Sequence, residues 1–112
     1  MFEARRIRAN DGDQGGGGLP QRRESELFAL GRTVITSNAQ AQLRSDDVQA
    51  ALYRHHRGDW GELDAQDWQA NQTALQDGLR LLSVYRDQNQ TKFYIITEWD
   101  RSITTILLPE DY

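Results

Sequence analysis

The sequence contains no cysteine, and this absence excludes several chemistries together. Disulfide frameworks, thiolate zinc sites, iron–sulfur clusters and cysteine nucleophiles all require a thiol. The fold must therefore be stabilised by the packing of apolar side chains. With 112 residues, of which 38% are hydrophobic, the chain has room for one modest domain.

Long apolar runs are also missing. The runs are only a few residues long, as at Ile106-Leu107-Leu108, whereas a bilayer helix needs about 20. We therefore expect no membrane partner. The N-terminal arginines precede no apolar segment with a small-residue cleavage site, so the sequence predicts no secretory signal and a cytoplasmic location.

Positive charge is scarce in most of the chain, whose net charge is −4. Residues 1–26 hold five arginines and five acids, whereas residues 27–112 hold 8 basic and 12 acidic residues. A protein that grips a phosphate backbone usually shows the reverse balance, so a nucleic-acid partner is disfavoured. The run Gly15–Gly18 lacks the Lys-Ser/Thr that completes a phosphate-binding loop, and we expect no cofactor.

The glycines divide the chain into two parts. Five of the nine lie in residues 1–26, together with Pro20 and scattered charges. Such a segment buries too little apolar surface to offset the entropy of ordering it. We therefore expect a disordered leader over residues 1–26 and a single domain over residues 27–112.

Within this domain the pattern predicts a strand and then helices. The β-branched run Thr33–Thr36 favours a strand, and a helical turn follows over Ala39–Leu43. A helix over residues 46–56 has Ser45 as its N-cap, and Gly58 as its stop. Asp64 begins a further helix, which Gly78 ends. The turn Gly58–Gly61 carries Trp60 as an anchor, and we expect Trp68 and Trp99 also to lie in the core or at its rim.

The last third of the chain changes to a period of two. Three β-rich runs, Leu79–Arg86, Lys92–Glu98 and Ile103–Leu108, are separated by turn-like residues and predict an antiparallel meander. Tight hairpins would place Val84 opposite Phe93 and Leu82 opposite Ile95 on the core face. The predicted fold class is α+β, with two or three short helices packed on this small meander.

The other face of the meander would be too apolar to be simply solvated. It would carry Leu81, Ser83, Tyr85, Tyr94, Ile96, Glu98, Thr105 and Leu107. Either the N-terminal segment or a partner chain must cover it. One form of the second alternative is an isologous homodimer through Tyr85, Tyr94, Ile96 and Leu107.

A polar row is predicted at one end of the core face, where Arg80, Thr97 and Thr104 line up across the strands. Asp100, Arg101 and Ser102 lie nearby in the sequence. Guanidinium and hydroxyl donors that converge on one spot can bind an anion. The alternative, which we favour, is a structural pair of Arg80 with Asp100, with both threonines as ordinary strand residues.

His55 and His56 are the only imidazoles. Adjacent helical side chains point about 100 degrees apart, so we expect no metal site. A positive His55 at a helix C-terminus would be favourable and would explain its presence. The catalytic alternative makes His55 the general acid, Glu98 the base and Arg101 the group that stabilises a phosphorane, as in a metal-independent ribonuclease of barnase-like or toxin type.

Several segments resemble one family of short bacterial proteins. They are Gly31–Val34, then His55 followed by Gly58–Gly61, then Gly78–Tyr85, and finally Ile95–Tyr112, which reads ITEWDRSITTILLPEDY from position 96. The family is found on plasmids, integrative elements and prophages, and the resemblance covers about residues 31–112. It implies a mobile-element context and no particular reaction. Smaller residues stand in the family at the positions of His56 and Trp99. The positions that match its pattern are His55, Asp59, Trp60, Asn71, Arg80, Tyr85, Glu98, Asp100, Arg101, Thr104 and Tyr112.

Together these observations predict a small intracellular accessory protein that acts by binding another macromolecule rather than by catalysis. The partner would be another protein or a second copy of the chain. Candidate binding residues are Arg80, Tyr85, Tyr94, Asp100 and Thr104. Two alternatives remain open: the ribonuclease that uses His55, Glu98 and Arg101, and an inhibitor of a host defence complex, whose acidity mimics nucleic acid.

Overall fold

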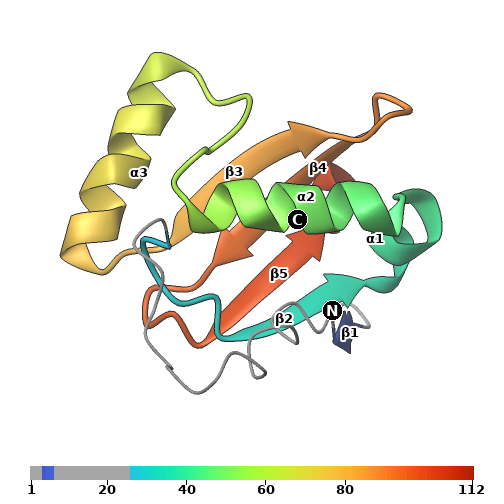
Figure 1. Cartoon of the computed structure of the whole chain (residues 1–112), viewed down its shortest axis with the longest axis horizontal. Coiled ribbons are helices and arrows are strands. Elements are labelled where there is room, and N and C mark those ends of the chain that lie inside the picture. Colours follow the sequence, from blue (N-terminus) through green and yellow to red (C-terminus); the bar gives the residue numbers. More distant parts are fainter. Residues whose placement is uncertain (1–3, 7–25) are drawn as a thin grey trace, which may run out of the picture.

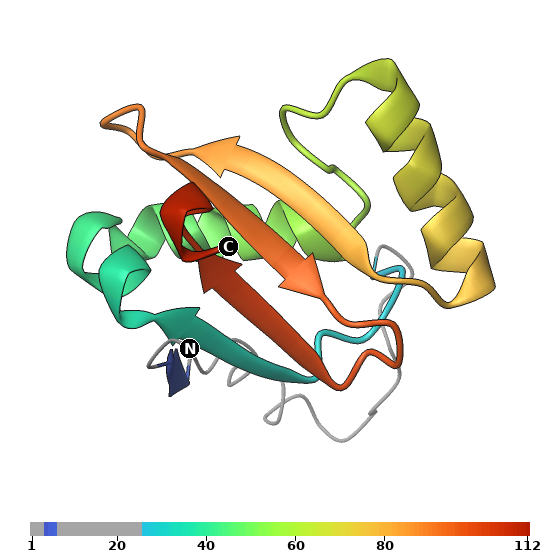
Figure 2. The ribbon, with the colours of Figure 1, turned by 180° about the vertical axis from the view of Figure 1, so that it is seen from behind.

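The computed structural model describes residues 4–6 and 26–112. These residues form a five-stranded sheet in the order β1-β2-β5-β4-β3 (Figures 1 and 2). The strands are β1 Ala4–Arg6, β2 Arg32–Thr36, β3 Leu81–Arg86, β4 Lys92–Thr97 and β5 Ile103–Leu107. Neighbouring strands are antiparallel except β2 and β5, which are parallel. The predicted meander and the α+β class are confirmed, and the added parallel strand makes the sheet mixed.

Three α-helices lie between β2 and β3 in the chain: α1 Ser37–Gln42, α2 Ser45–His56 and α3 Ala65–Asp77. Helix α2 crosses one face of the sheet, whereas α3 stands beside the β3 edge (Figure 1). Asp64 caps α3 by accepting a hydrogen bond from the Asp67 amide at 2.8 Å, and Gly78 ends it at φ +70°, as predicted. The predicted cap of α2 is wrong by one residue, because Arg44 occupies the N-cap without a side-chain bond.

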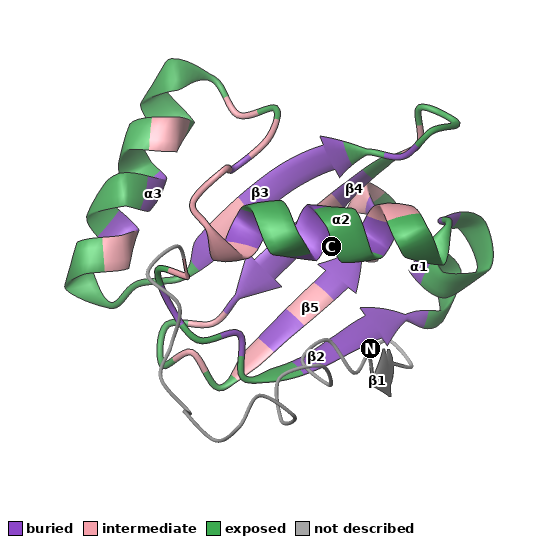
Figure 3. Ribbon diagram, viewed as in Figure 1, coloured by how far each residue is buried: buried purple, intermediate pink, exposed green. Residues whose placement is uncertain are grey.

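The core lies between α2 and the sheet, and Figure 3 shows the buried positions gathered there. Helix α2 buries Val48, Ala51, Leu52 and His55, at the spacing of one helical face. Trp60 is fully buried and anchors its turn as predicted. Trp68 packs partly buried against this core, but Trp99 is 64% exposed, so the prediction that it lies in the core or at its rim is wrong.

The pairing of β3 with β4 differs by one residue from the predicted register. Tyr85 pairs with Phe93, and Ser83 with Ile95. The connecting loop is longer than a tight hairpin, because Gln90 adopts a left-handed φ of +67° and the Asp87 amide donates to the Thr91 carbonyl.

A shift of one residue moves every side chain of a strand to the opposite face. Leu81, Ser83 and Tyr85 therefore belong to the buried side of β3, instead of Leu82 and Val84. The predicted core faces of β4 and β5 are correct, because Ile95 pairs with Ile106 as expected.

The outer edge of β3 is closed by the chain's own groups. Asn71 of α3 donates its Nδ2 to the Leu82 carbonyl at 2.6 Å and accepts from the Leu82 amide at 3.2 Å. The Val84 amide donates to the Trp60 carbonyl, and the Val84 carbonyl accepts from the Glu62 amide. The backbone groups of Leu82 and Val84 that point away from β4 are thus already paired.

The apolar side chains on the sheet face opposite α2 are less exposed to solvent than the sequence predicts. Val34, Val84, Ile96 and Leu107 are each at most 8% exposed. The short 3-10 helix η2, Pro109–Asp111, folds back on this side next to β4 (Figure 2). The ring of Tyr112 then meets that of Tyr94 edge-on at 6.0 Å.

The predicted disordered leader lies largely outside the described residues, since residues 1–3 and 7–25 are not described. Its described part includes Ala4–Arg6, which forms β1 against β2. Among the described residues, no helix is both long enough and apolar enough to cross a membrane.

Candidate functional site

His55 lies at the centre of a buried chain of hydrogen bonds. Its Nδ1 lies 2.5 Å from the Ser83 Oγ, and its Nε2 lies 2.9 Å from the Thr97 Oγ1. Thr97 and Thr104 pair their hydroxyls at 2.7 Å, and the Thr104 hydroxyl donates to the Leu30 carbonyl. All four side chains are fully buried.

The last bond of this chain fixes the direction of the others. Because Thr104 gives its proton to the Leu30 carbonyl, it must accept from Thr97. Thr97 has then used its only proton, so it accepts from the Nε2–H of His55. The Nδ1 of His55 accepts in turn from Ser83. One neutral tautomer of His55 therefore satisfies every partner.

Burial lowers the pKa of His55 to about 3, and the nearby charges of His56 and Arg101 lower it further. The imidazole is therefore neutral at pH 7, not the positive helix-end group that the sequence predicts. Sequence analysis missed Ser83 as its partner. The signal was present as three hydroxyl residues at inward positions of otherwise apolar strands, but it depends on the correct register.

The predicted catalytic trio does not form a site among the described residues. Phe28 covers His55, with ring centroids 5.2 Å apart, and the same ring lies 5.7 Å from the Arg101 guanidinium. Glu98 instead pairs with Arg80 at 3.2 Å. A general acid must reach its substrate, and a fully enclosed imidazole that bonds two protein hydroxyls has no such access.

Arg101 holds three parts of the chain together. Its Nη1 donates to the carbonyls of Leu79 and Glu98, at 2.6 and 3.1 Å, and its Nη2 donates to that of Ala74 at 3.1 Å. Its backbone takes a left-handed φ of +62° in the loop between β4 and β5. These bonds join the end of α3 and the start of β3 to that loop, and they leave the guanidinium few donors for an external anion.

The predicted polar row is correct only in part. Thr97 does pair with Thr104, but Leu81 rather than Arg80 completes their row. The expected pair of Arg80 with Asp100 is also wrong, because Arg80 binds Glu98. The Asp100 carboxylate accepts from the Ser102 hydroxyl and amide, which lower its pKa.

The predicted binding residues separate by exposure. Thr104 and Tyr85 are buried, so neither can contact a partner of the folded protein, and these two assignments are corrected. The physical reason for Tyr85 is the register shift, which turns it toward α2. Arg80 and Asp100 are exposed, and Tyr94 is half-buried.

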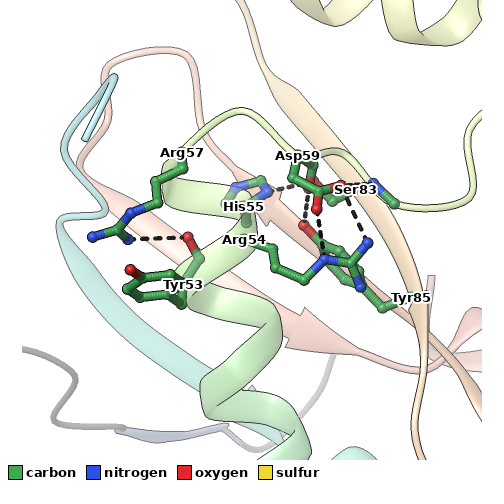
Figure 4. Close-up of polar contacts among 8 residues, drawn as sticks. Tyr53, Arg54, His55, Arg57, Asp59, Ser83 and Tyr85 are labelled. Carbon is green, nitrogen blue, oxygen red and sulfur yellow. Dashed lines mark hydrogen bonds and ion pairs between the residues drawn. The ribbon is translucent and has the colours of Figure 1, made fainter. Parts of the chain in front are cut away.

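Tyr85 is fixed by contacts near the C-terminal end of α2 (Figure 4). Its hydroxyl donates to the Asp59 carbonyl at 2.6 Å, and burial raises its pKa. The Arg54 guanidinium lies over its ring and donates two hydrogen bonds to the Asp59 carboxylate, which hold the pKa of that carboxyl low. On the outer side of α2, Arg57 stacks on the exposed ring of Tyr53.

The exposed apolar side chains identify a different surface, which we name the apolar end and define by Leu27, Leu79 and Trp99. They are 41%, 52% and 64% exposed. Leu27 precedes Phe28, the Leu79 carbonyl binds Arg101, and Trp99 lies in the Arg101 loop. Figure 1 shows these three segments at the same end of the molecule.

Within residues 26–112, no group of three or more His, Asp or Glu side chains is placed to hold a metal ion. Comparison of the chain with protein-family models, curated proteins and solved structures gives no match.

Proposed function

We propose that the chain is a small accessory protein of a mobile element, acting in the cytoplasm by binding another protein rather than by catalysis. The observation that carries this proposal is the apolar end, where Leu27, Leu79 and Trp99 are exposed on segments that lie at the same end of the molecule. Exposure of the large apolar surface of tryptophan to water is unfavourable, and tryptophan is enriched in the centres of protein interfaces.

The surroundings of Trp99 favour an interface. Arg80 and Glu98 form an ion pair next to it, and Asp100 adds a second charge. A polar rim around an apolar centre is the usual anatomy of a protein–protein contact. Arg101 holds the Trp99 loop in place before any partner arrives, so little conformational entropy is lost on binding.

The first test compares Trp99→Ala with Tyr53→Ala, a matched exposed aromatic on the outer side of α2. Tagged wild-type protein and both variants are expressed in the host, and the captured proteins are quantified by mass spectrometry. We expect Trp99→Ala to lower capture of a specific protein by about tenfold or more, because buried tryptophan anchors dominate interfaces.

Tyr53→Ala should keep the wild-type capture, and both variants should keep the wild-type midpoint of thermal unfolding. Equal capture by all three proteins would refute the apolar end as the contact surface. The identity of the captured protein also tests the inhibitor alternative, which requires a component of a host defence complex. The ribonuclease alternative would instead be supported if RNA decays in the presence of a chelator at a rate that rises with the concentration of the purified protein.

A further inference from the structure

The two edges of the sheet differ in how they are closed. The β3 edge is blocked by the Asn71 side chain and by the Trp60–Glu62 segment, which belong to the body of the domain. Among the described residues, the β2 edge is covered by β1 alone, a strand of three residues. The cover of the β2 edge is therefore separable from the domain, whereas that of the β3 edge is not.

One contact shows which backbone groups of β2 point toward β5 and which point toward β1. The Arg32 amide donates to the Ser102 carbonyl, so the backbone groups of Arg32 point toward β5. Directions alternate along a strand, and hence Ile35 points toward β1. Because Ile35 pairs with Arg5 in an antiparallel register, these two residues exchange both bonds. Within Ala4–Arg6 this is the single hydrogen-bonded pair.

A long connection joins β1 to β2. It spans the 25 residues from Ile7 to Gly31 and contains Gly15–Gly18. Its last residues belong to the domain, where Phe28 and Leu30 are buried. The tether is therefore at most the 19 residues 7–25, and a glycine-rich sequence of that length spans about 24 Å when it behaves as a flexible chain. Such a tether allows β1 to reach the edge of another molecule as well as its own.

We propose that the β2 edge is a strand-exchange site whose occupant is β1 of a second copy of the chain. This proposal rests on the observation that the β2 edge already pairs with the sequence of β1 in a defined register. Charge supports the exchange, because residues 1–10 hold three arginines and one glutamate, whereas residues 27–112 have 8 basic and 12 acidic residues. This surface is separate from the apolar end and does not depend on it.

Reciprocal exchange replaces each strand pairing by an identical one, so the monomer and the exchanged dimer differ mainly in the entropy of association. A flexible tether gives its own strand an effective concentration on the order of 1 mM. We therefore expect a monomer at micromolar concentration and exchanged dimers as the protein approaches 1 mM.

Disulfide trapping tests the exchange in the full chain, which has no cysteine of its own. Arg6 pairs with Val34 in a position that lacks mutual hydrogen bonds, where Cα atoms lie about 4.5 Å apart and a disulfide is permitted. Arg6→Cys and Val34→Cys are prepared as two separate proteins. The two are mixed at about 1 mM under mild oxidation, and the bonded peptides are identified by mass spectrometry.

We expect a disulfide between positions 6 and 34 of different chains, which an unexchanged strand cannot form. A mixture of Arg6→Cys with Gln69→Cys, an exposed position on α3, measures random collision and should give at least tenfold less product. The double variant Arg6→Cys/Val34→Cys should close the bond within one chain in dilute solution. The proposal is overturned if the 6–34 product does not exceed the product of the collision control. It is also overturned if the double variant fails to form its disulfide within one chain.

Discussion

At the scale of single residues, His55 owes its properties to three hydroxyl groups and a ring. Ser83, Thr97 and Thr104 arrange its two nitrogens as one acceptor and one donor, and Phe28 excludes water from it. A buried polar group is tolerated only when its hydrogen bonds are satisfied, and here each is. The residue that looked most like a catalyst in the sequence is thus explained by packing.

The first prediction concerns the pH dependence of stability. The pKa of His55 is about 3 in the folded chain and 6.5 in the unfolded chain, so the unfolded state binds the proton first as the pH falls. Its contribution to stability is complete above pH 6.5 and declines below it. The free energy of unfolding should fall by about 2 kcal/mol between pH 6.5 and 4.5.

Urea unfolding at several pH values measures this fall. The range stops at pH 4.5 because the aspartates, whose reference pKa is 3.8, contribute at lower pH. The matched variant His55→Gln cannot titrate, so its stability should change much less over the same range. Parallel curves for the two proteins would show that His55 is not held neutral by the fold.

At the scale of elements, the two edges and the two faces of the sheet are set by details of a few side chains. Asn71 is an example, because its amide pairs with Leu82 as the backbone of a neighbouring strand would. The helical spacing of Trp68, Asn71 and Leu75 indicates which side of α3 is buried, but not that an amide there pairs with a strand edge.

The second prediction is that Asn71→Asp destabilises the fold by about 1–3 kcal/mol. The new carboxylate still accepts from the Leu82 amide but cannot donate to the Leu82 carbonyl, and it repels that oxygen. Gln69→Glu makes the same chemical change on the exposed side of α3 and should alter stability by less than about 0.5 kcal/mol. Chemical denaturation measures both values, and similar losses in the two variants would argue against the clamp.

How far the sequence predicts the fold also differs between elements. Capping residues such as Asp64 and Gly78 act locally, and the helix they bound is predicted correctly. The faces of β4 and β5 follow from alternation and are also correct. The face of β3 fails because it depends on the conformation of one loop residue, Gln90, which carries no glycine or asparagine signal for a left-handed φ.

The one-residue register shift of β3 also limits how much of the candidate site can be predicted. It turns Tyr85 inward and brings Ser83 into contact with His55. The burial of Tyr85 and the role of Ser83 therefore depend on the loop between β3 and β4 rather than on these residues themselves. The exposure of Trp99 is similarly unpredictable, because apolar composition suggests burial until the loop around Arg101 is known.

At the scale of the whole molecule, the chain's C-terminal residues fasten β2 and α1 to the far end of the sequence. The Asp111 carboxylate accepts hydrogen bonds from the Thr36 hydroxyl, the Asn38 side-chain amide and the Leu108 backbone amide. Partial burial alone would raise the pKa of Asp111, but these three donors lower it overall. Contacts across more than seventy residues favour cooperative unfolding.

The third prediction is that Asp111→Ala destabilises the fold by about 1–3 kcal/mol, because three donors lose their acceptor at once. Glu110→Ala removes a neighbouring exposed carboxylate and should leave stability nearly unchanged. Thermal unfolding compares the two, and hydrogen exchange at the amides of β2 shows where protection is lost. An Asp111→Ala midpoint equal to that of Glu110→Ala would contradict the clamp.

The closed edge at Asn71 also limits how these molecules can assemble. Fibrillar growth by stacked strands requires each added chain to offer a fresh row of unpaired amides and carbonyls. A copy that has received a foreign strand at its β2 side offers no such row on the β3 side over Leu82 and Val84. Concentrated solutions should therefore stay clear, with no thioflavin-positive filaments.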